Sequence, residues 1–278
     1  NGLETGAAAR CDAGAVLPST LAPLPDCLVG LRLVPRRGAP LQLGAAHLRF
    51  GVLDVPLGGF WQSNGRGNEL LVEELRKAAL ELAPLGGHVL ELYCGAGNLT
   101  RVLAESSTHL VAVEASADAI AALNRRADMA TVASAGSAPS AVSDAGHAAS
   151  GLSATTLAGS AAAGKTSGPS VGAASSSIWG TSQIELHAQP VERFLAACRA
   201  DFDWVVLDPP RSGAAVAIPE LVRLRPRGVI YISCDLHTAA RDIEQLLGAG
   251  YELTRVQPID MFPQTYHVET IFVLRDAH

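Results

Sequence analysis

The chain has 278 residues, a formal net charge of −6 and 48% hydrophobic residues, which is enough apolar material for a sizeable core. Its five cysteines form neither a C-x-x-C pair nor a metal-ligand cluster, and their odd number argues against a disulfide framework. No apolar run reaches the roughly 18 to 20 residues of a membrane-spanning helix, and the acidic balance argues against nucleic-acid binding by bulk electrostatics alone.

The first part of the chain differs from the rest. Residues 1–58 scatter Pro and Gly among short apolar runs without a helical period, which is typical of the tail of a β-rich domain. Residues 64–82 then show an apolar face at helical spacing. We therefore predict a β-rich remnant over 1–58 and a second domain over 59–278 that opens with an amphipathic helix.

From residue 88 onward, short β-branched runs alternate with amphipathic stretches. The pattern predicts strands over 88–93, 110–114, 184–187, 204–208, 229–232, 251–256 and 268–274. It predicts helices over 99–105, 116–126, 191–199, 218–224 and 238–247. Such alternation indicates an α/β fold with a doubly wound, largely parallel sheet, whose ligands bind at the carboxyl ends of the strands.

A low-complexity segment interrupts this pattern. Residues from about 130 to 182 are dominated by Ala, Ser, Gly and Thr, with almost no charge. A segment of this kind cannot bury enough apolar surface to offset its ordering entropy, and a long loop closes at little extra cost. We expect a disordered insertion without chemistry of its own.

A glycine-rich turn follows the first predicted strand, over Tyr93-Cys94-Gly95-Ala96-Gly97-Asn98. Glycines let a ligand approach the backbone, and Glu114, at the end of the next strand, is placed to accept hydrogen bonds from ribose hydroxyls. A plain tight turn is the alternative. The turn lacks a full G-x-G-x-x-G and a phosphate-binding Lys, so a sulfonium nucleoside, S-adenosylmethionine, fits better than a dinucleotide.

Two further motifs follow later strands. In Asp208-Pro209-Pro210-Arg211 the prolines remove two amide donors and stiffen the backbone, which would hold Asp208 over the crevice; a helix cap or turn acid is the alternative. Two roles are left open for Arg211, a contact to a phosphate group or an ion pair at the surface. Cys234 lies where a strand gives way to a helix, and helix amides there would favour its thiolate, although most cysteines are small buried hydrophobes.

Six motifs occur in the order typical of one family: FWQSN, ELYCGAGN, VAVEAS, DPPRSG, ISCDLHTAARD and DMFPQTYHVET. On these motifs the chain resembles the RNA uracil-C5 methyltransferases, which form 5-methyluridine in tRNA or rRNA. The resemblance implies a Rossmann-like class I methyltransferase fold and makes residues 1–58 a remnant of a central or RNA-contacting domain. It implies that the residues of the S-adenosylmethionine site are Gln62, Tyr93, Gly95, Asn98, Glu114 and Asp208.

The same resemblance implies that Cys234 is the nucleophile and Glu269 the proton acceptor. The Cys234 thiolate would add to uracil C6, C5 would take the methyl group, and Glu269 would remove the C5 proton. We expect burial to raise the pKa of Glu269. His267 could tune Glu269 or be structural, and Phe262 and Tyr266 are candidates for stacking on an unstacked or flipped uridine.

One departure from the family pattern lies beside the predicted nucleophile. Leu236 stands where the family has proline, and we expect the missing ring to loosen the loop that aims Cys234. A methyltransferase of other specificity and a non-catalytic RNA-binding relative remain as alternative functions. As partners we predict RNA, with no membrane and no metal. We further predict a monomer in a reducing compartment, the cytoplasm, with an organelle stroma or matrix left open.

Overall fold

The computed structural model describes residues 30–33, 41–44, 47–50, 53–56, 59–82, 87–125, 174–179 and 182–278. The first of these ranges form two antiparallel hairpins, β1 (Gly30–Leu33) with β2 (Leu41–Gly44) and β3 (His47–Phe50) with β4 (Leu53–Pro56). The strands agree with the β-rich segment expected there. The other positions within 1–58 lie outside the described residues.

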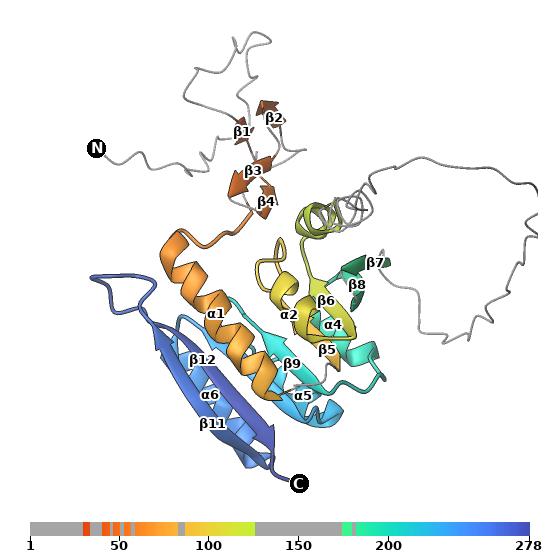
Figure 1. The fold of residues 1–278 in the computed structure, drawn as a ribbon, viewed down its shortest axis with the longest axis vertical. Helices are drawn as coiled ribbons and strands as arrows, with labels where there is room; N and C mark the ends of the chain where they lie inside the picture. The colour runs from red at the N-terminus through yellow and green to blue at the C-terminus, as the bar shows by residue number, and fades with distance from the viewer. Residues whose placement is uncertain are drawn as a thin grey trace, which may run out of the picture.

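One eight-stranded sheet organises the rest, in the order β11-β12-β10-β9-β5-β6-β8-β7 (Figure 1). The five central strands are parallel: β10 (Gly228–Ser233), β9 (Trp204–Leu207), β5 (His88–Leu92), β6 (His109–Glu114) and β8 (Ser182–Ala188). The antiparallel strands lie at the edges: β11 (Tyr251–Ile259), β12 (Glu269–Asp276) and β7 (Ala174–Trp179).

Helices cover both faces of this sheet, which confirms the predicted α/β class. One core joins strand residues such as Val89 and Ile230 to α1 (Gly65–Leu82), α2 (Thr100–Ser106) and the helical residues 117–125. The other joins the alternate strand residues to α4 (Val191–Ala197), α5 (Ile218–Leu224) and α6 (Leu236–Gly248). Because successive strand residues point to opposite faces, continuous apolar runs supply both cores at once.

The strand order places a topological switch point between β5 and β9. From β5 the chain moves outward through β6 to β8, and from β9 it moves the other way to β10. Crevices for ligands form at the carboxyl ends of strands at such a point. The glycine-rich turn after β5 and the Asp208 loop after β9 therefore face each other across one crevice.

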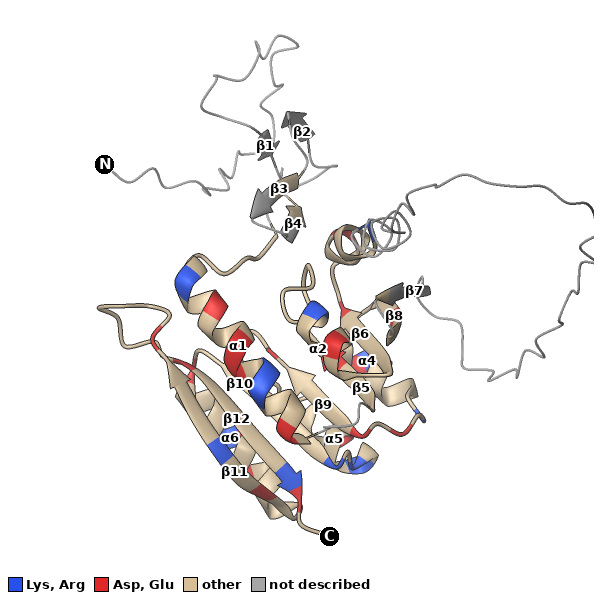
Figure 2. Ribbon diagram, viewed as in Figure 1, with Lys and Arg blue, Asp and Glu red and all other residues tan. Residues whose placement is uncertain are grey.

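Helix α1 also carries most of the charge visible along one face of the sheet, with Lys or Arg and Asp or Glu interspersed (Figure 2). Lys77 contacts Glu73 and Glu74 on its own helix at 3.0 and 2.9 Å. Arg255 of β11 bonds to Glu74 and, at 3.0 Å, to Glu81. These pairs of opposite sign are typical of a solvated helix that is tied to a sheet edge, and not of a basic stripe for RNA.

The predicted disordered insertion was wrong at its C-terminal end. Residues 174–179 form β7, which pairs with β8 in the register Ser177↔Ile184. Composition reports how little apolar surface a segment can bury, but it does not report main-chain hydrogen bonding to an open strand edge such as that of β8. Residues 126–173, 180 and 181 lie outside the described residues. Within the described ranges, no helix is long and apolar enough to cross a membrane.

Candidate active site

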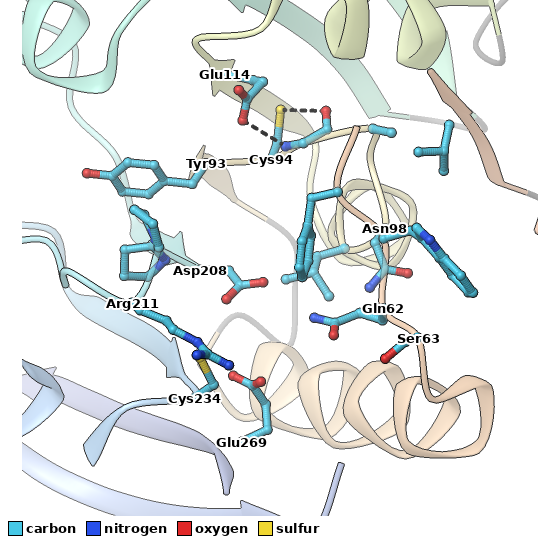
Figure 3. Close-up of a pocket in the computed structure, with 18 of the residues that line it drawn as sticks. Gln62, Ser63, Tyr93, Cys94, Asn98, Glu114, Asp208, Arg211, Cys234 and Glu269 are labelled. Atoms are coloured by element: carbon cyan, nitrogen blue, oxygen red, sulfur yellow. Dashed lines mark hydrogen bonds between the residues drawn. The ribbon is translucent and has the colours of Figure 1, made fainter. Parts of the chain in front are cut away.

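A cavity of about 580 Å³ opens at the carboxyl ends of the central strands (Figure 3). All the residues that the sequence analysis assigned to the site line it: Gln62, Tyr93, Gly95, Asn98, Glu114, Asp208, Cys234 and Glu269. These residues come from the segment before α1 and from the ends of five strands, β5, β6, β9, β10 and β12. The fold therefore brings the predicted cofactor residues and the predicted catalytic pair to one place.

The glycine-rich turn after β5 is built from residues with positive φ. Gly97 has φ +86°, and a Cβ there would lie 2.2 Å from Leu123 Cδ1, so no side chain fits. Gly95 has φ +55°, and a Cβ there would meet nothing within 4 Å. Glycine is thus needed at 97 for packing, whereas at 95 it leaves the backbone open to the cavity.

Glu114 orients this turn. One carboxylate oxygen accepts a hydrogen bond from the Gly95 N–H at 3.1 Å, and the other accepts one from the Ser116 N–H at 2.8 Å. A carboxylate oxygen has a second lone pair, so Glu114 keeps the capacity to accept from a ligand hydroxyl. Asn98 is held similarly, since its side-chain amide and that of Asn68 on α1 bond reciprocally at 2.7 and 3.0 Å.

Glu91 is a cavity residue that the sequence analysis missed. It is 1% exposed, and neither of its carboxyl oxygens has a hydrogen-bond partner among the described residues. Burial outweighs the opposing effect of the nearby Thr100 hydroxyl and, with the charges of Asp208 and Glu114, raises the pKa of Glu91 to about 8. A carboxyl group without a partner inside a buried strand is costly, so its presence in the apolar run Val89–Leu92 was a usable signal.

The antiparallel register of β10 and β12 brings Cys234 and Glu269 together. Ser233 at the end of β10 pairs with Thr270 near the start of β12, so the next residue on one strand and the previous residue on the other are neighbours. Glu269 is 3% exposed, and its Oε1 has no hydrogen-bond partner in the described part of the chain. Burial, with the Asp208 charge, raises the pKa of Glu269 to about 8, which confirms the expected direction.

The expectation that helix amides favour the Cys234 thiolate was wrong. Burial and the Glu269 charge raise the pKa of the Cys234 thiol above its usual range. The first free amides of α6, those of His237 and Thr238, both donate to Asp235 Oδ1 at 3.0 Å and so do not face the thiol. Asp235 is the N-cap residue of this helix, and it takes the donors that the prediction assigned to the cysteine.

Arg211 is the cation that faces the thiol (Figure 3). Its hydrogen bond and positive charge lower the pKa of Cys234 and so oppose the effect of burial. Asp208 lies nearby in the cavity, and burial raises the pKa of its carboxyl to about 7. The cavity lining thus includes four carboxyl groups, two thiols and one guanidinium, a balance suited to a ligand with positive charge.

The other candidates lie at the edge of the site. Phe262 lines the cavity, whereas Tyr266 is 88% exposed and stacks at a tilt on His267 with a centroid distance of 4.2 Å. His267 is not among the cavity-lining residues. In the described ranges, no cluster of three or more His, Cys, Asp or Glu side chains could hold a metal ion.

The loop at Leu236 is held by hydrogen bonds that need no proline ring, and the expected loosening stays a prediction. Ser233 Oγ accepts from the Asp235 N–H and donates to the Asp235 carbonyl, both at 3.0 Å. Asp235 in turn caps α6. Leu236 is the first helical residue and is 49% exposed. The backbone beside Cys234 is thereby fixed by the side chains of its neighbours.

This geometry predicts that Leu236→Pro is tolerated. An amide at the first helical position has no acceptor within the helix, and Asp235, with φ −128° and ψ 104°, is extended as a residue before proline prefers. We expect the free energy of unfolding to rise by about 0.4–1 kcal/mol, because proline lowers the conformational entropy of the unfolded chain. Urea denaturation checks this, with Leu236→Ala as the control for loss of the side chain. A destabilised Leu236→Pro variant would show that the loop does not accept proline.

Known proteins similar to this chain are RNA methyltransferases. Residues 195–277 match the sequence model of the family described as tRNA (Uracil-5-)-methyltransferase. An uncharacterized RNA methyltransferase of Thermotoga maritima is 45% identical over 104 residues, 37% of this chain and 24% of that protein. The 23S rRNA (uracil(1939)-C(5))-methyltransferase of Klebsiella pneumoniae is 29% identical over 209 residues, 73% of this chain and 37% of that protein. The chain thus spans less than two fifths of these relatives.

The fold is also found in a solved structure. The tRNA (uracil-54, C5)-methyltransferase of Pyrococcus abyssi, solved in complex with S-adenosyl-L-homocysteine, superposes with a TM-score of 0.57 at 20% identity, covering 88% of this chain and 50% of that one. This likeness confirms the predicted class I methyltransferase fold. Together, the matched family model and the relatives make this chain similar to the RNA uracil-C5 methyltransferases, and the solved structure shows that it shares their fold.

Proposed function

We propose that this protein transfers a methyl group from S-adenosylmethionine to C5 of a uridine in tRNA or rRNA. The observation that carries the proposal is one cavity that contains both the glycine-rich turn and the Cys234–Glu269 pair. The names of the matched family and of the relatives support the same reaction. We keep as predictions that the enzyme acts in the cytoplasm and as a monomer.

The residues present fit S-adenosylmethionine. Its ammonium and sulfonium groups are cationic, and the cavity presents the carboxyl groups of Glu91, Glu114 and Asp208. Glu91 has two buried oxygens without a partner among the described residues, which a ligand ammonium would satisfy. A volume of about 580 Å³ suits a ligand of this size. The bound cofactor supplies an electrophilic methyl group.

Each cofactor residue then has a proposed role. Glu91 would bind the ammonium group, Glu114 would accept from the ribose hydroxyls, and Asp208 would offer a carboxyl group to the cationic ligand. The backbone at Gly95 allows close approach, since no atom occupies the space beside its Cα. The remaining wall of the site is formed by the side chains of Gln62, Tyr93 and Asn98.

Glu91→Gln tests the ammonium site. Losing a charge-assisted hydrogen bond costs about 1.5–3 kcal/mol, so we expect S-adenosylmethionine to bind about 10- to 100-fold more weakly by calorimetry. The exposed Glu105→Gln variant is the control and should bind normally. Unchanged affinity in Glu91→Gln would remove Glu91 from the cofactor site.

The same variant should alter the pH dependence of stability. The pKa of Glu91 is raised from 4.5 to about 8 in the folded state, so the ligand-free protein loses stability as pH rises across that window, because only the unfolded state ionises. Asp208 and Glu269 act in the same direction. Glu91→Gln should therefore show a smaller fall in the free energy of unfolding between pH 4.5 and 8 in urea titrations.

In the proposed reaction Cys234 acts first. Its thiolate sulfur forms a bond to uracil C6, and the electrons of the C5–C6 double bond move to the C4 oxygen as an enolate. C5 then takes the methyl group. Glu269 accepts the C5 proton, the C5–C6 double bond re-forms, and the C6–sulfur bond breaks to release Cys234. Arg211 stabilises the thiolate before addition and after release, since it lies beside the sulfur.

RNA that contains 5-fluorouridine tests this proposal directly. Fluorine at C5 cannot leave as a proton, so methylated substrate should stay bound to Cys234 as a complex that survives denaturation. We expect to isolate this complex after denaturation when the purified chain is mixed with the RNA and S-adenosylmethionine. We expect no such complex when S-adenosylmethionine is omitted. Bound S-adenosylmethionine without any RNA adduct or methyl transfer would favour a non-catalytic relative.

A further inference from the structure

A network of hydrogen bonds around one buried carboxylate lies against the loop that carries Asp208 and Arg211. Asp242 on α6 is 0% exposed, and its Oδ2 accepts hydrogen bonds from the Ala214 N–H at 2.6 Å and from the Tyr231 hydroxyl at 2.8 Å. Arg241 donates two hydrogen bonds to Asp242 Oδ1, at 2.9 and 2.8 Å, and a third to the Ser212 carbonyl at 3.2 Å. One carboxylate thus joins α6, β10 and residues 212–214.

Gly213 shows how closely the loop lies against this network. Its φ is +78°, and a Cβ there would come within 2.6 Å of Arg241 Nη2 and 2.7 Å of Asp242 Oδ2. A side chain at this position would push the loop away from α6. The loop backbone and the helix are therefore locked together over residues 212–214.

The two parts that this network joins are the two parts that meet at the thiol. The loop after β9 carries Arg211, and α6 begins two residues after Cys234. The charged or titratable groups that face the thiol are Glu269 from β12 and Arg211 and Asp208 from the loop. A small shift of the loop away from α6 would move Arg211 away from the sulfur and leave the charge of Glu269 without compensation.

We propose that Asp242 is a positioning residue, which holds the loop 208–214 against α6 and thereby keeps Arg211 beside the Cys234 thiol. The Asp242 carboxylate is fully buried, whereas the side chain of its partner Arg241 is 48% exposed. The catalytic consequence rests on the proposed function. The environment of Cys234 itself can be measured without RNA or cofactor.

The test is the pH dependence of Cys234 alkylation by iodoacetamide in the full chain, followed by mass spectrometry of the Cys234 peptide. Asp242→Asn removes the charge that binds Arg241 while keeping the side-chain shape. Only the thiolate reacts with iodoacetamide, so the midpoint of the rate–pH profile reports the ionisation of Cys234. In Asp242→Asn we expect this midpoint to move to higher pH, and alkylation below the midpoint to be about threefold slower than in the wild type. Asp276→Asn disrupts a similar bidentate pair with Arg225, bonded at 2.9 and 2.8 Å outside the cavity, and should leave the profile unchanged.

A double-mutant cycle makes the test specific. Arg211→Gln should reproduce the shift, and adding Asp242→Asn to it should cause no further shift, since the network acts through Arg211. An unchanged profile in folded Asp242→Asn, or a further shift in the double variant, would overturn the proposal. If Asp242→Asn does not fold, Tyr231→Phe removes one hydrogen bond and should give a smaller shift in the same direction; an unchanged profile there overturns it too.

Alkylation and methyl transfer separate the two proposals. A shifted alkylation profile in a chain that never methylates RNA would support the positioning role and reject the proposed function. If the chain methylates RNA, Asp242→Asn should lower kcat and the rate of 5-fluorouridine trapping, with S-adenosylmethionine affinity unchanged. A normal alkylation profile together with normal kcat would reject the positioning role and retain the proposed function.

Discussion

Cys234→Ala is expected to lower kcat for RNA methylation by roughly 10⁴-fold or more and to abolish the 5-fluorouridine adduct. The thiol provides the bond to C6 that activates C5, and no other thiol lines the cavity near Glu269; Cys94 is buried in the glycine-rich turn. Cys234 is only partly buried, so the fold should be retained. Methyl incorporation into RNA and gel analysis of the adduct measure both effects.

Cys198→Ala is the matched control. Cys198 is also a free cysteine, buried at the end of α4 and outside the cavity lining. Its replacement should cost about 1 kcal/mol of stability and leave kcat unchanged. Substantial methyl transfer by Cys234→Ala would exclude the covalent mechanism and favour direct transfer by an enzyme of other specificity.

Glu269→Gln is expected to separate the addition of Cys234 and methyl transfer from the later removal of the C5 proton and release of the RNA. The amide keeps the shape of the side chain but cannot accept the C5 proton, so kcat should fall by about 10²- to 10⁴-fold. Addition of Cys234 does not need this base. The RNA adduct should therefore form on ordinary uridine-containing RNA and persist long enough to be seen in denaturing gels after rapid quenching.

The pH profile gives a second measure of the same residue. The pKa of Glu269 is about 8 and the pKa of the Cys234 thiol is also raised, so both groups are largely neutral at pH 6. Wild-type kcat should rise with pH through about 8 as Glu269 ionises. Glu252→Gln, an exposed substitution on β11, should keep this profile. Rapid release of RNA by Glu269→Gln would contradict the assignment of Glu269 as the base.

The regular part of the fold could be predicted because its signals are local. The apolar runs at Val89–Leu92 and Val229–Ile232 lie in strands, and the ends of most elements agree within one or two residues. Strand β7 was missed because its pairing with β8 is a main-chain contact that low-complexity composition does not encode. Positions 1–29 and 126–173 lie outside the described residues.

That these motifs would meet at one cavity was also predictable, because they follow strands whose ends meet in this fold class. The electrostatic state of the site was not. Cys234 was expected to gain from helix amides, but Asp235 binds those amides, and Arg211 provides the compensating charge instead. Glu91 and Asp242 were overlooked because a single buried acid in an apolar pattern gives no indication of its partners.

The amino-acid sequence by itself determined the α/β architecture and the residues that could carry the chemistry, since hydrophobic periodicity and strand-end motifs depend on near neighbours. Only the tertiary structure decided which charges face Cys234 and Glu269, which acid lacks a partner, and how the loop at Arg211 is held against α6. The physical reason is that pKa values and buried ion pairs depend on burial and on groups from distant parts of the chain, which meet only in the folded protein.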